Sequence, residues 1–219
     1  MSPIDAVIFD MDGTLTDSEH WWDEVRRGMA ADAGRPWPDD ATRRQMGMST
    51  REWASYLVEV VGIPGTWQQV AQQAIDGMVA RYHAGVPLLP GADEAVRRMA
   101  QRWPIAICSS SPRTLIDAVA AEMGWDELLA ARVSTEEVPR GKPHPDGYLR
   151  AAELLGTEPG RCVVVEDAAN GVRSAMAAGM KVVAVPPHFN PPPDELLAEC
   201  DLVIDNLDEL TVAAVEELG

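Results

Sequence analysis

The chain contains few cysteines, few lysines and no long apolar runs. Among its 219 residues, three are cysteines, and the two lysines are Lys142 and Lys181. The cysteine count is odd and no CxxC pair occurs, so neither a complete disulfide framework nor a zinc site is expected. No apolar run approaches the roughly 18 residues of a membrane span. Asp5 and the lack of a basic flank before the first apolar run do not fit a secretory signal. We therefore expect a cytoplasmic protein with reduced thiols.

Basic residues are also scarce relative to acidic ones. The chain has 35 Asp and Glu against 18 Lys and Arg, which gives a net charge of −17. A nucleic-acid-binding protein needs basic residues to neutralise phosphates, and an anionic membrane repels an acidic surface, so we expect neither partner. A phosphorylated ligand would have to be held by a few local cations and a metal ion. The apolar fraction of 46% excludes a disordered chain.

Short apolar runs alternate with helical patterns along most of the chain. Such runs are typical of buried parallel strands. They lie at residues 6–9, 105–108, 162–165, 182–185 and 202–204, with a weaker run at 131–133. Helical patterns lie at about 112–123, 145–155, 168–178 and 207–218. This alternation predicts an α/β fold with a doubly wound, Rossmann-like parallel sheet.

One stretch, from about residue 18 to residue 88, shows only helical signals. Apolar residues recur there at four-residue spacing in three sets, which begin at Trp21, Trp53 and Val70, and glycine or proline separates the sets. Because this stretch follows the first strand, we predict an inserted α-helical cap domain over 18–87. The α/β core domain would then comprise 1–17 and 88–219. The alternative is that these helices cover one face of the sheet.

The first strand ends in an acidic sequence, Asp10-Met11-Asp12-Gly13. Ligands of α/β sheets bind beyond the carboxyl ends of the strands, and residues i and i+2 of a strand share one side. Asp10 and Asp12 can thus face one site, where two carboxylates imply a divalent metal or an acid–base pair. Gly13 permits a sharp turn. Taken alone, this sequence fits a solvated turn equally well.

A second acidic pair, Glu166 and Asp167, follows the strand at 162–165. A helix begins directly afterwards, so Asp167 could instead cap that helix. Four carboxylates at one edge of a sheet are, however, unfavourable without a cation. Oxygen ligands of this kind suit Mg²⁺, which also bridges to phosphate. The two pairs together therefore predict a magnesium site.

Candidate anion-binding residues lie in two further segments. Ser109, Ser110 and Ser111 follow the strand at 105–108, where hydroxyls and backbone N–H groups can hold an anion. Ser111 precedes a proline and fits a helix cap, whereas Ser109 is expected to point at the site. Lys142 stands in a loop pinned by two prolines before a helix. We predict that it binds phosphate; the alternative is ordinary surface charge.

Together and in this order, these elements resemble the four motifs of the haloacid dehalogenase superfamily of phosphotransferases, over essentially the whole chain. The corresponding residues are Asp10 and Asp12, Ser109, Lys142, and Glu166 with Asp167. The helical insertion after the first motif is similar to that of members with an α-helical cap. Segments 141–146 and 166–171 resemble the β-phosphoglucomutase-like branch, which contains many sugar-phosphate phosphatases.

This resemblance implies a mechanism through an aspartyl-phosphate. Asp10 would be the nucleophile that attacks phosphorus. Asp12 would protonate the leaving alcohol and later deprotonate the hydrolytic water. Mg²⁺ would bind the Asp10 carboxylate, the backbone carbonyl of Asp12 and Asp167, with Glu166 in or near its shell. The phosphoryl oxygens would be held by Ser109, Ser110 and Lys142.

Departures from the family patterns distinguish between its reactions. Haloacid dehalogenases lack the second aspartate, which is present here as Asp12, and phosphonate hydrolases use a cap lysine, which residues 18–87 do not contain. The mutase branch has a histidine where this chain has Trp22, with His20 two residues earlier. Its cap arginine is delayed here to Arg51, behind Gly47-Met48-Ser49-Thr50. Hydrolysis is therefore favoured over phosphomutase activity.

Residues of the predicted cap are expected to select the substrate. The candidates are Glu19, His20, Trp22 and Arg51. Each has a simpler explanation: paired tryptophans commonly pack between helices, and His20 fits an exposed helix start. Arg51 could form a salt bridge with Glu52 or Glu59.

The sequence thus predicts a Mg²⁺-dependent phosphatase that acts on a small phosphorylated metabolite, in the first place a sugar phosphate. We expect a monomer or a weak homodimer. One alternative is a β-phosphoglucomutase-type phosphomutase. Another is a non-enzymatic binding protein of the same fold, against which the complete set of acidic motif residues argues.

Overall fold

The computed structural model describes residues 3–45 and 48–219, and the contacts within it divide the chain into two units. One unit comprises Met1–Asp17 and Val86–Gly219, and the other comprises Ser18–Gly85. The predicted insertion over 18–87 corresponds to the second unit, except that the chain returns to the first unit at Val86.

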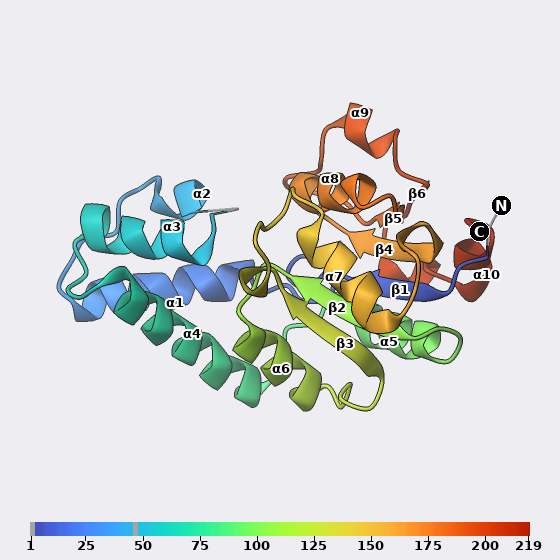
Figure 1. The fold of residues 1–219 in the computed structure, drawn as a ribbon. Coiled ribbons are helices and arrows are strands. Elements are labelled where there is room, and N and C mark those ends of the chain that lie inside the picture. The colour runs from blue at the N-terminus through green and yellow to red at the C-terminus, as the bar shows by residue number, and fades with distance from the viewer. Residues whose placement is uncertain (1–2, 46–47) are drawn as a thin grey trace. The chain divides into compact units, whose positions relative to one another are not determined.

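The first unit is an α/β unit built on a six-stranded parallel sheet (Figure 1). The strands are β1 (Ala6–Phe9), β2 (Ile105–Ser109), β3 (Leu129–Ser134), β4 (Cys162–Glu166), β5 (Lys181–Ala184) and β6 (Leu202–Val203). Their order is β3-β2-β1-β4-β5-β6, and every neighbouring pair is parallel. The predicted α/β fold class is confirmed. Because β1 lies between β2 and β4, the ends of these three strands share one edge of the sheet.

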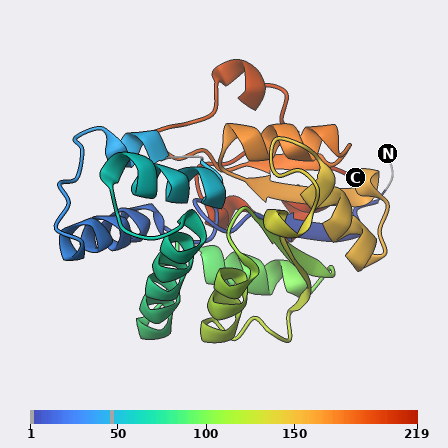
Figure 2. The ribbon, with the colours of Figure 1, turned by 60° about the vertical axis from the view of Figure 1, so that its left-hand side comes forward.

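Helices cover both faces of this sheet (Figures 1 and 2). On one face, α7 (Asp146–Leu155) and α8 (Ala169–Ala177) share a buried core with alternate strand residues such as Ala6 and Ile8. On the opposite face lie α5 (Ala92–Ala100) and α6 (Arg113–Glu122). The unit also contains α9 (Asp194–Leu197), α10 (Val212–Glu216) and 3₁₀ turns at Thr135–Glu137, Pro159–Arg161 and Leu207–Glu209.

Three helices of the α/β unit differ from the sequence prediction. No helix was predicted at α5 or at α9, although Ala92, Val96 and Met99 place a buried stripe along α5. The predicted helix over 207–218 is instead a 3₁₀ turn followed by α10. The Thr211 hydroxyl accepts a hydrogen bond from the backbone N–H of Ala214, so it caps a new helix and ends the turn before it.

Within the described residues, every regular element of the second unit is a helix, and loops join these helices. It consists of α1 (Glu19–Asp32), α2 (Ala41–Gln45), α3 (Thr50–Tyr56), the π-helical turn η1 (Leu57–Val61) and α4 (Trp67–Ala84). Capping boxes start two of these helices, with Ser49 and Thr66 as the N-cap residues of α3 and α4. Gly62, with φ of 84°, ends η1 in the left-handed conformation. The predicted glycine and proline breaks thus separate the helices.

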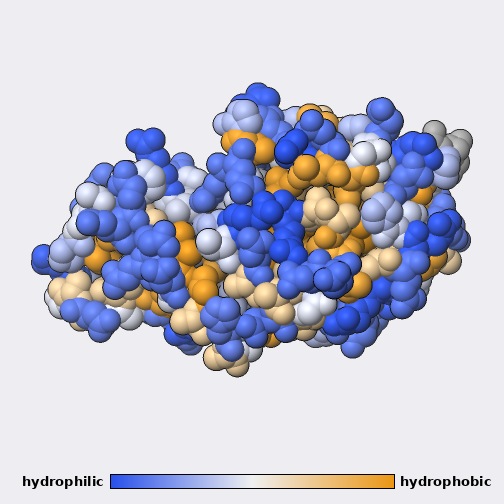
Figure 3. Space-filling model, turned by 60° about the horizontal axis from the view of Figure 1, so that its bottom comes forward, coloured by the Kyte–Doolittle hydropathy of each residue, from blue (hydrophilic) through white to orange (hydrophobic). Residues whose placement is uncertain are grey.

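Hydrophilic residues cover most of the face shown in Figure 3, and apolar patches lie between them. This surface agrees with the large number of charged residues in the sequence. Within residues 3–45 and 48–219, no helix has both the length and the apolar character needed to cross a membrane.

Candidate active site

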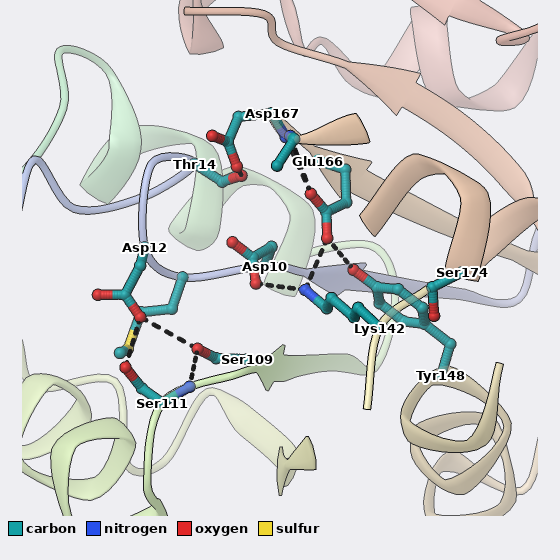
Figure 4. Close-up of polar contacts among 12 residues, drawn as sticks. Asp10, Asp12, Thr14, Ser109, Ser111, Lys142, Tyr148, Glu166, Asp167 and Ser174 are labelled. Carbon is teal, nitrogen blue, oxygen red and sulfur yellow. Dashed lines mark hydrogen bonds and ion pairs between the residues drawn. The ribbon is translucent and has the colours of Figure 1, made fainter. Parts of the chain in front are cut away.

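The predicted motif residues of the α/β unit meet at the carboxyl edge of the sheet (Figure 4). Asp10 directly follows β1, whereas Ser109 and Glu166 are the last residues of β2 and β4. Lys142 reaches the same place from the loop before α7. Segments that are far apart in the sequence therefore contribute side chains to one site.

Lys142 connects two of the carboxylates. Its Nζ atom donates to Oδ1 of Asp10 at 2.5 Å and to Oε1 of Glu166 at 2.6 Å. The side chain of Lys142 is only 9% exposed and that of Glu166 only 1%. Burial disfavours the ammonium charge, but Asp10 and Glu166 outweigh it and raise the pKa of Lys142. Lys142 is therefore a charged residue of the site, and the alternative of ordinary surface charge is wrong.

Three carboxylates form a buried acidic cluster. Asp10, Glu166 and Asp167 each have an oxygen within 4.8 Å of the others. Burial, with Glu166 nearby, raises the pKa of Asp167 to about 7. Burial likewise raises the pKa of Asp10 well above its ordinary value, although Lys142 opposes the shift. One lysine does not balance three carboxylates, and oxygen ligands suit a divalent cation, so the cluster fits a metal ion such as Mg²⁺.

The turn after β1 positions Asp167. Oγ1 of Thr14 donates to Oδ1 of Asp167 at 3.0 Å. Gly13 has a φ of 89°, and a Cβ atom on it would lie 2.3 Å from Oδ2 of Asp167, so only glycine fits there. The sharp turn expected at Gly13 is thus present. Asp167 does not cap α8, because the N-cap residue of that helix is Ala168 and it makes no side-chain capping bond.

The Asp12 side chain points to the end of β2 rather than into the acidic cluster (Figure 4). Oδ2 of Asp12 accepts hydrogen bonds from Oγ of Ser109 at 3.1 Å and from Oγ of Ser111 at 2.7 Å. The backbone N–H of Ser111 in turn donates to Oγ of Ser109 at 3.0 Å. The two hydroxyls therefore orient Asp12. A metal contact through the backbone carbonyl of Asp12 stays a prediction.

The structure corrects one of the three serine assignments. Ser111 is not a helix cap, because Pro112 is the N-cap residue of α6 and no side chain caps that end. Ser111 instead donates a hydrogen bond to Asp12. Its position two residues after Ser109 could have suggested this role. Ser110 is exposed beside the end of β2, and its contact with phosphate stays a prediction.

The Glu166 carboxylate accepts four hydrogen bonds from the protein. Its Oε1 atom accepts from Lys142 and from the hydroxyl of Tyr148, the latter at 2.6 Å. Its Oε2 atom accepts from the backbone N–H groups of Asp167 and Ala168 at 3.1 and 3.2 Å. Tyr148 was not among the predicted site residues. Its only signal in the sequence is that it carries a hydroxyl while its neighbours on the buried side of α7 are small residues without one.

Two of the residues predicted to contact substrate, Trp22 and Arg51, have aromatic neighbours within the helical unit. Trp22 is 9% exposed, and its ring lies 5.8 Å from that of Trp53 and 4.9 Å from the Arg26 guanidinium group. Trp22 therefore packs within the helical unit, and its contact with a substrate stays a prediction. The guanidinium group of Arg51 lies 5.8 Å from the ring of Trp67.

The remaining predictions for this unit concern its exposed residues. Glu19, His20 and Arg51 are exposed, and the ring of His20 lies 6.0 Å from that of Trp21. Their contact with a substrate stays a prediction. Gly47, at the start of the segment that precedes Arg51, lies outside the described residues.

Known proteins are similar in sequence to this chain, over most of their own length or over part of it. Residues 4–179 match the family of haloacid dehalogenase-like hydrolases. Hexitol phosphatase B from Escherichia coli is 32% identical over 213 residues, which cover 94% of each chain. The bifunctional riboflavin kinase/FMN phosphatase of Arabidopsis thaliana is 31% identical over 204 residues. That match covers 92% of this chain and 53% of the plant protein, so the chain spans about half of its length.

A solved structure shows the same fold. The structure of CbbY from Rhodobacter sphaeroides in complex with phosphate has a TM-score of 0.84 and 25% sequence identity, and the match covers 97% of this chain and 99% of that one. The resemblance drawn from the four motifs is thereby confirmed. With its parallel sheet, its four motifs at one edge and these relatives, the chain belongs to the haloacid dehalogenase-like hydrolases.

Proposed function

We propose that this protein is a Mg²⁺-dependent phosphatase that hydrolyses a small phosphorylated metabolite, in the first place a sugar phosphate, through an aspartyl-phosphate on Asp10. The observation that carries this proposal is the pairing of the buried Asp10 carboxylate with Lys142, next to the carboxylates of Glu166 and Asp167. The name of the Escherichia coli relative, a hexitol phosphatase, supports a sugar phosphate as substrate.

The chemistry would divide between the two aspartates of the first motif. A carboxylate oxygen of Asp10 attacks phosphorus, and the bond from phosphorus to the leaving alcohol breaks. Asp12 gives its proton to that alcohol and then takes a proton from a water molecule. This water attacks the aspartyl-phosphate, which releases phosphate and restores Asp10. The hydroxyl of Ser111 holds Asp12 in one orientation during both steps.

The positive charge for the phosphoryl group would come from Lys142 and from the metal ion. Carboxylates of Asp10 and Asp167 and the backbone carbonyl of Asp12 would hold Mg²⁺, with Glu166 in or near its shell. When bound, Mg²⁺ offsets the negative charge of the phosphoryl oxygens. Lys142, which pairs with Asp10, would hold one of these oxygens.

Ser109 and Ser110 are the remaining proposed contacts to the phosphoryl oxygens. The Ser109 hydroxyl donates to Asp12 in this structure. Rotation about its C–O bond can turn the hydroxyl proton towards a phosphoryl oxygen. Ser110 is exposed at the same edge and can contribute its hydroxyl or its backbone N–H group.

The test is a phosphate-release screen with Mg²⁺ over sugar phosphates, nucleotides and small phosphorylated acids. The Asp10→Asn variant should lose turnover by about a thousandfold or more, because an amide oxygen is a poor nucleophile. Asp205→Asn, which changes an exposed carboxylate in the same unit, should turn over the ester at the wild-type rate. Equal activity of the wild type and Asp10→Asn would remove the assignment of the nucleophile.

A phosphomutase is the second candidate, because segments 141–146 and 166–171 resemble the β-phosphoglucomutase-like branch. A coupled assay with β-glucose 1-phosphate separates the two reactions. Free phosphate supports the phosphatase, whereas glucose 6-phosphate without free phosphate supports the mutase. The absence of turnover on every ester, with and without Mg²⁺, would favour a binding protein.

A further inference from the structure

Tyr148 is a buried residue of α7 that the proposed mechanism does not use. It has no exposed surface, and its hydroxyl donates to Oε1 of Glu166 at 2.6 Å. Its ring lies 5.1 Å from Nζ of Lys142. The phenol is the donor of this hydrogen bond, because the carboxylate of Glu166 accepts it.

The Glu166 carboxylate that receives this hydrogen bond is tightly enclosed. A carboxylate offers about four positions for hydrogen bonds, and the four donors described above occupy both oxygens. Gly171 in α8 lies directly against it, since a Cβ atom there would lie 1.7 Å from Oε1. Glu166 is thus held in one place by protein groups on every side.

Lys142 is shared between this fixed carboxylate and Asp10. Its Nζ atom lies 2.6 Å from Glu166 and 2.5 Å from Asp10, so the two carboxylates compete for one ammonium group. The hydroxyl of Tyr148 donates to the same Oε1 atom that contacts Lys142 and withdraws negative charge from it. Without this donor, Oε1 would carry more negative charge and would compete more strongly with Asp10 for the ammonium group of Lys142.

We propose that Tyr148 is a positioning residue, which acts through Glu166 to keep the ammonium group of Lys142 on Asp10. This inference rests on the proposed function, because Lys142 matters at that place only if it receives a phosphoryl group. The residue itself touches neither Asp10 nor the reacting atoms. Its effect on the reaction is carried by the contact between Lys142 and Asp10.

The test uses Tyr148→Phe, which removes the hydroxyl and keeps the ring in the core. The loss of one hydrogen bond to a charged group should lower kcat by about tenfold. The affinity of the Mg²⁺-loaded protein for inorganic phosphate, measured by calorimetry, should fall by a similar factor. A crystal structure of the variant should show Lys142 displaced from Asp10. The melting temperature should fall by only a few degrees.

Trp103→Phe is the matched control. It also removes a buried donor on a ring, the indole N–H that bonds to the backbone carbonyl of Ile4 at 3.0 Å, before the start of β1 and so away from the site. This variant should lose stability and keep the kcat and phosphate affinity of the wild type. Losses of kcat of the same size in both variants would mean that Tyr148 has only a structural role.

The proposal is overturned if Tyr148→Phe has wild-type kcat and phosphate affinity, or if Lys142 keeps its contact with Asp10 in the variant crystal. The phosphate affinity and the variant structure can be measured without a known substrate. If the wild type hydrolyses no ester, the phosphatase proposal fails, while phosphate binding and the variant structure still test the role of Tyr148.

Discussion

The two units of the molecule bury positive charge in different ways. In the α/β unit, Lys142 lies between the carboxylates of Asp10 and Glu166. In the helical unit, the guanidinium group of Arg26 lies against the rings of Trp22 and Trp53, at 4.9 and 4.6 Å from their centroids. Burial lowers the pKa of Arg26 to about 10, although Glu19 and Asp23 oppose the shift, and its buried Nε atom has no hydrogen-bond partner in the described part of the chain.

This difference separates a chemical role from a packing role. The ammonium group of Lys142 has carboxylate partners at the end of the sheet, where a ligand binds. Arg26 makes cation–π contacts with two side chains of its own helical bundle, and such contacts stabilise packing. A buried cation is therefore a candidate for catalysis when its partners lie at the ends of strands. Variants of the two units should consequently affect different properties, activity in one and stability in the other.

Among the variants that compare the two units, the largest effect is expected for Lys142→Met. It leaves Asp10 and Glu166 buried without their cation and removes the proposed contact to the phosphoryl group. We expect phosphate release to fall by at least about a hundredfold. The free energy of unfolding should also fall, by about 3 to 5 kcal/mol. Phosphate release and thermal unfolding measure the two effects.

Lys181→Met is the natural control, because Lys181 is the only other lysine in the sequence. Lys181 lies at the start of β5 and pairs with Asp201 at 2.8 Å, with its side chain 41% exposed. Its loss should leave turnover unchanged and shift stability by about 0.5 kcal/mol at most. Comparable losses of activity in both variants would refute the distinction between a site lysine and a surface lysine.

The parts of the site that the sequence predicted are those fixed by strand ends. Asp10, Ser109 and Glu166 stand at the ends of apolar runs, and parallel neighbours bring such ends together. Lys142 was recognised because lysine is rare and its loop is rigid. The fold followed from the same alternation of runs and helices, which identified every strand of the sheet to within a few residues.

What the sequence did not reveal depends on directions of side chains and on packing between distant segments. Ser111 looked like a cap because it precedes a proline, and only the structure shows its hydroxyl on Asp12. Tyr148 has the spacing of a core residue, and its contact with Glu166 joins α7 to β4. Trp22 was assigned to substrate because it stands where the mutase branch has a histidine, and only the structure shows that its ring packs against Trp53.

A smaller effect, on stability, is expected from the acidic cluster in the metal-free protein. The pKa of Asp167 is raised from 3.8 to about 7, so its penalty is absent below pH 3.8 and complete above about pH 7. With a chelator present, Asp167→Asn should melt at a higher temperature than the wild type at pH 8, and the difference should be clearly smaller at pH 5, where only part of the penalty is present. Thermal unfolding of both proteins at both pH values measures this difference.

Added Mg²⁺ should reverse this order at pH 8, because the ion stabilises the wild type and binds the variant less well. The Asp205→Asn variant, altered at an exposed carboxylate, should follow the wild type under every condition. A difference in melting temperature between Asp167→Asn and the wild type that is equal at pH 5 and pH 8 would contradict the raised pKa.

The smallest effect concerns the helical unit and involves no charge. Gly28 is exposed in the interior of α1, and a Cβ atom there would meet no atom within 4 Å. Gly28→Ala should therefore stabilise the unit by about 1 kcal/mol, the difference in helix propensity, without a change in turnover. Gly77 in α4 is the control, because its Cβ atom would lie 3.2 Å from Cγ1 of Val25 and offset that gain. If both alanine variants gained equally in thermal unfolding, helix propensity alone would govern this unit, and the close packing of α1 against α4 would contribute nothing.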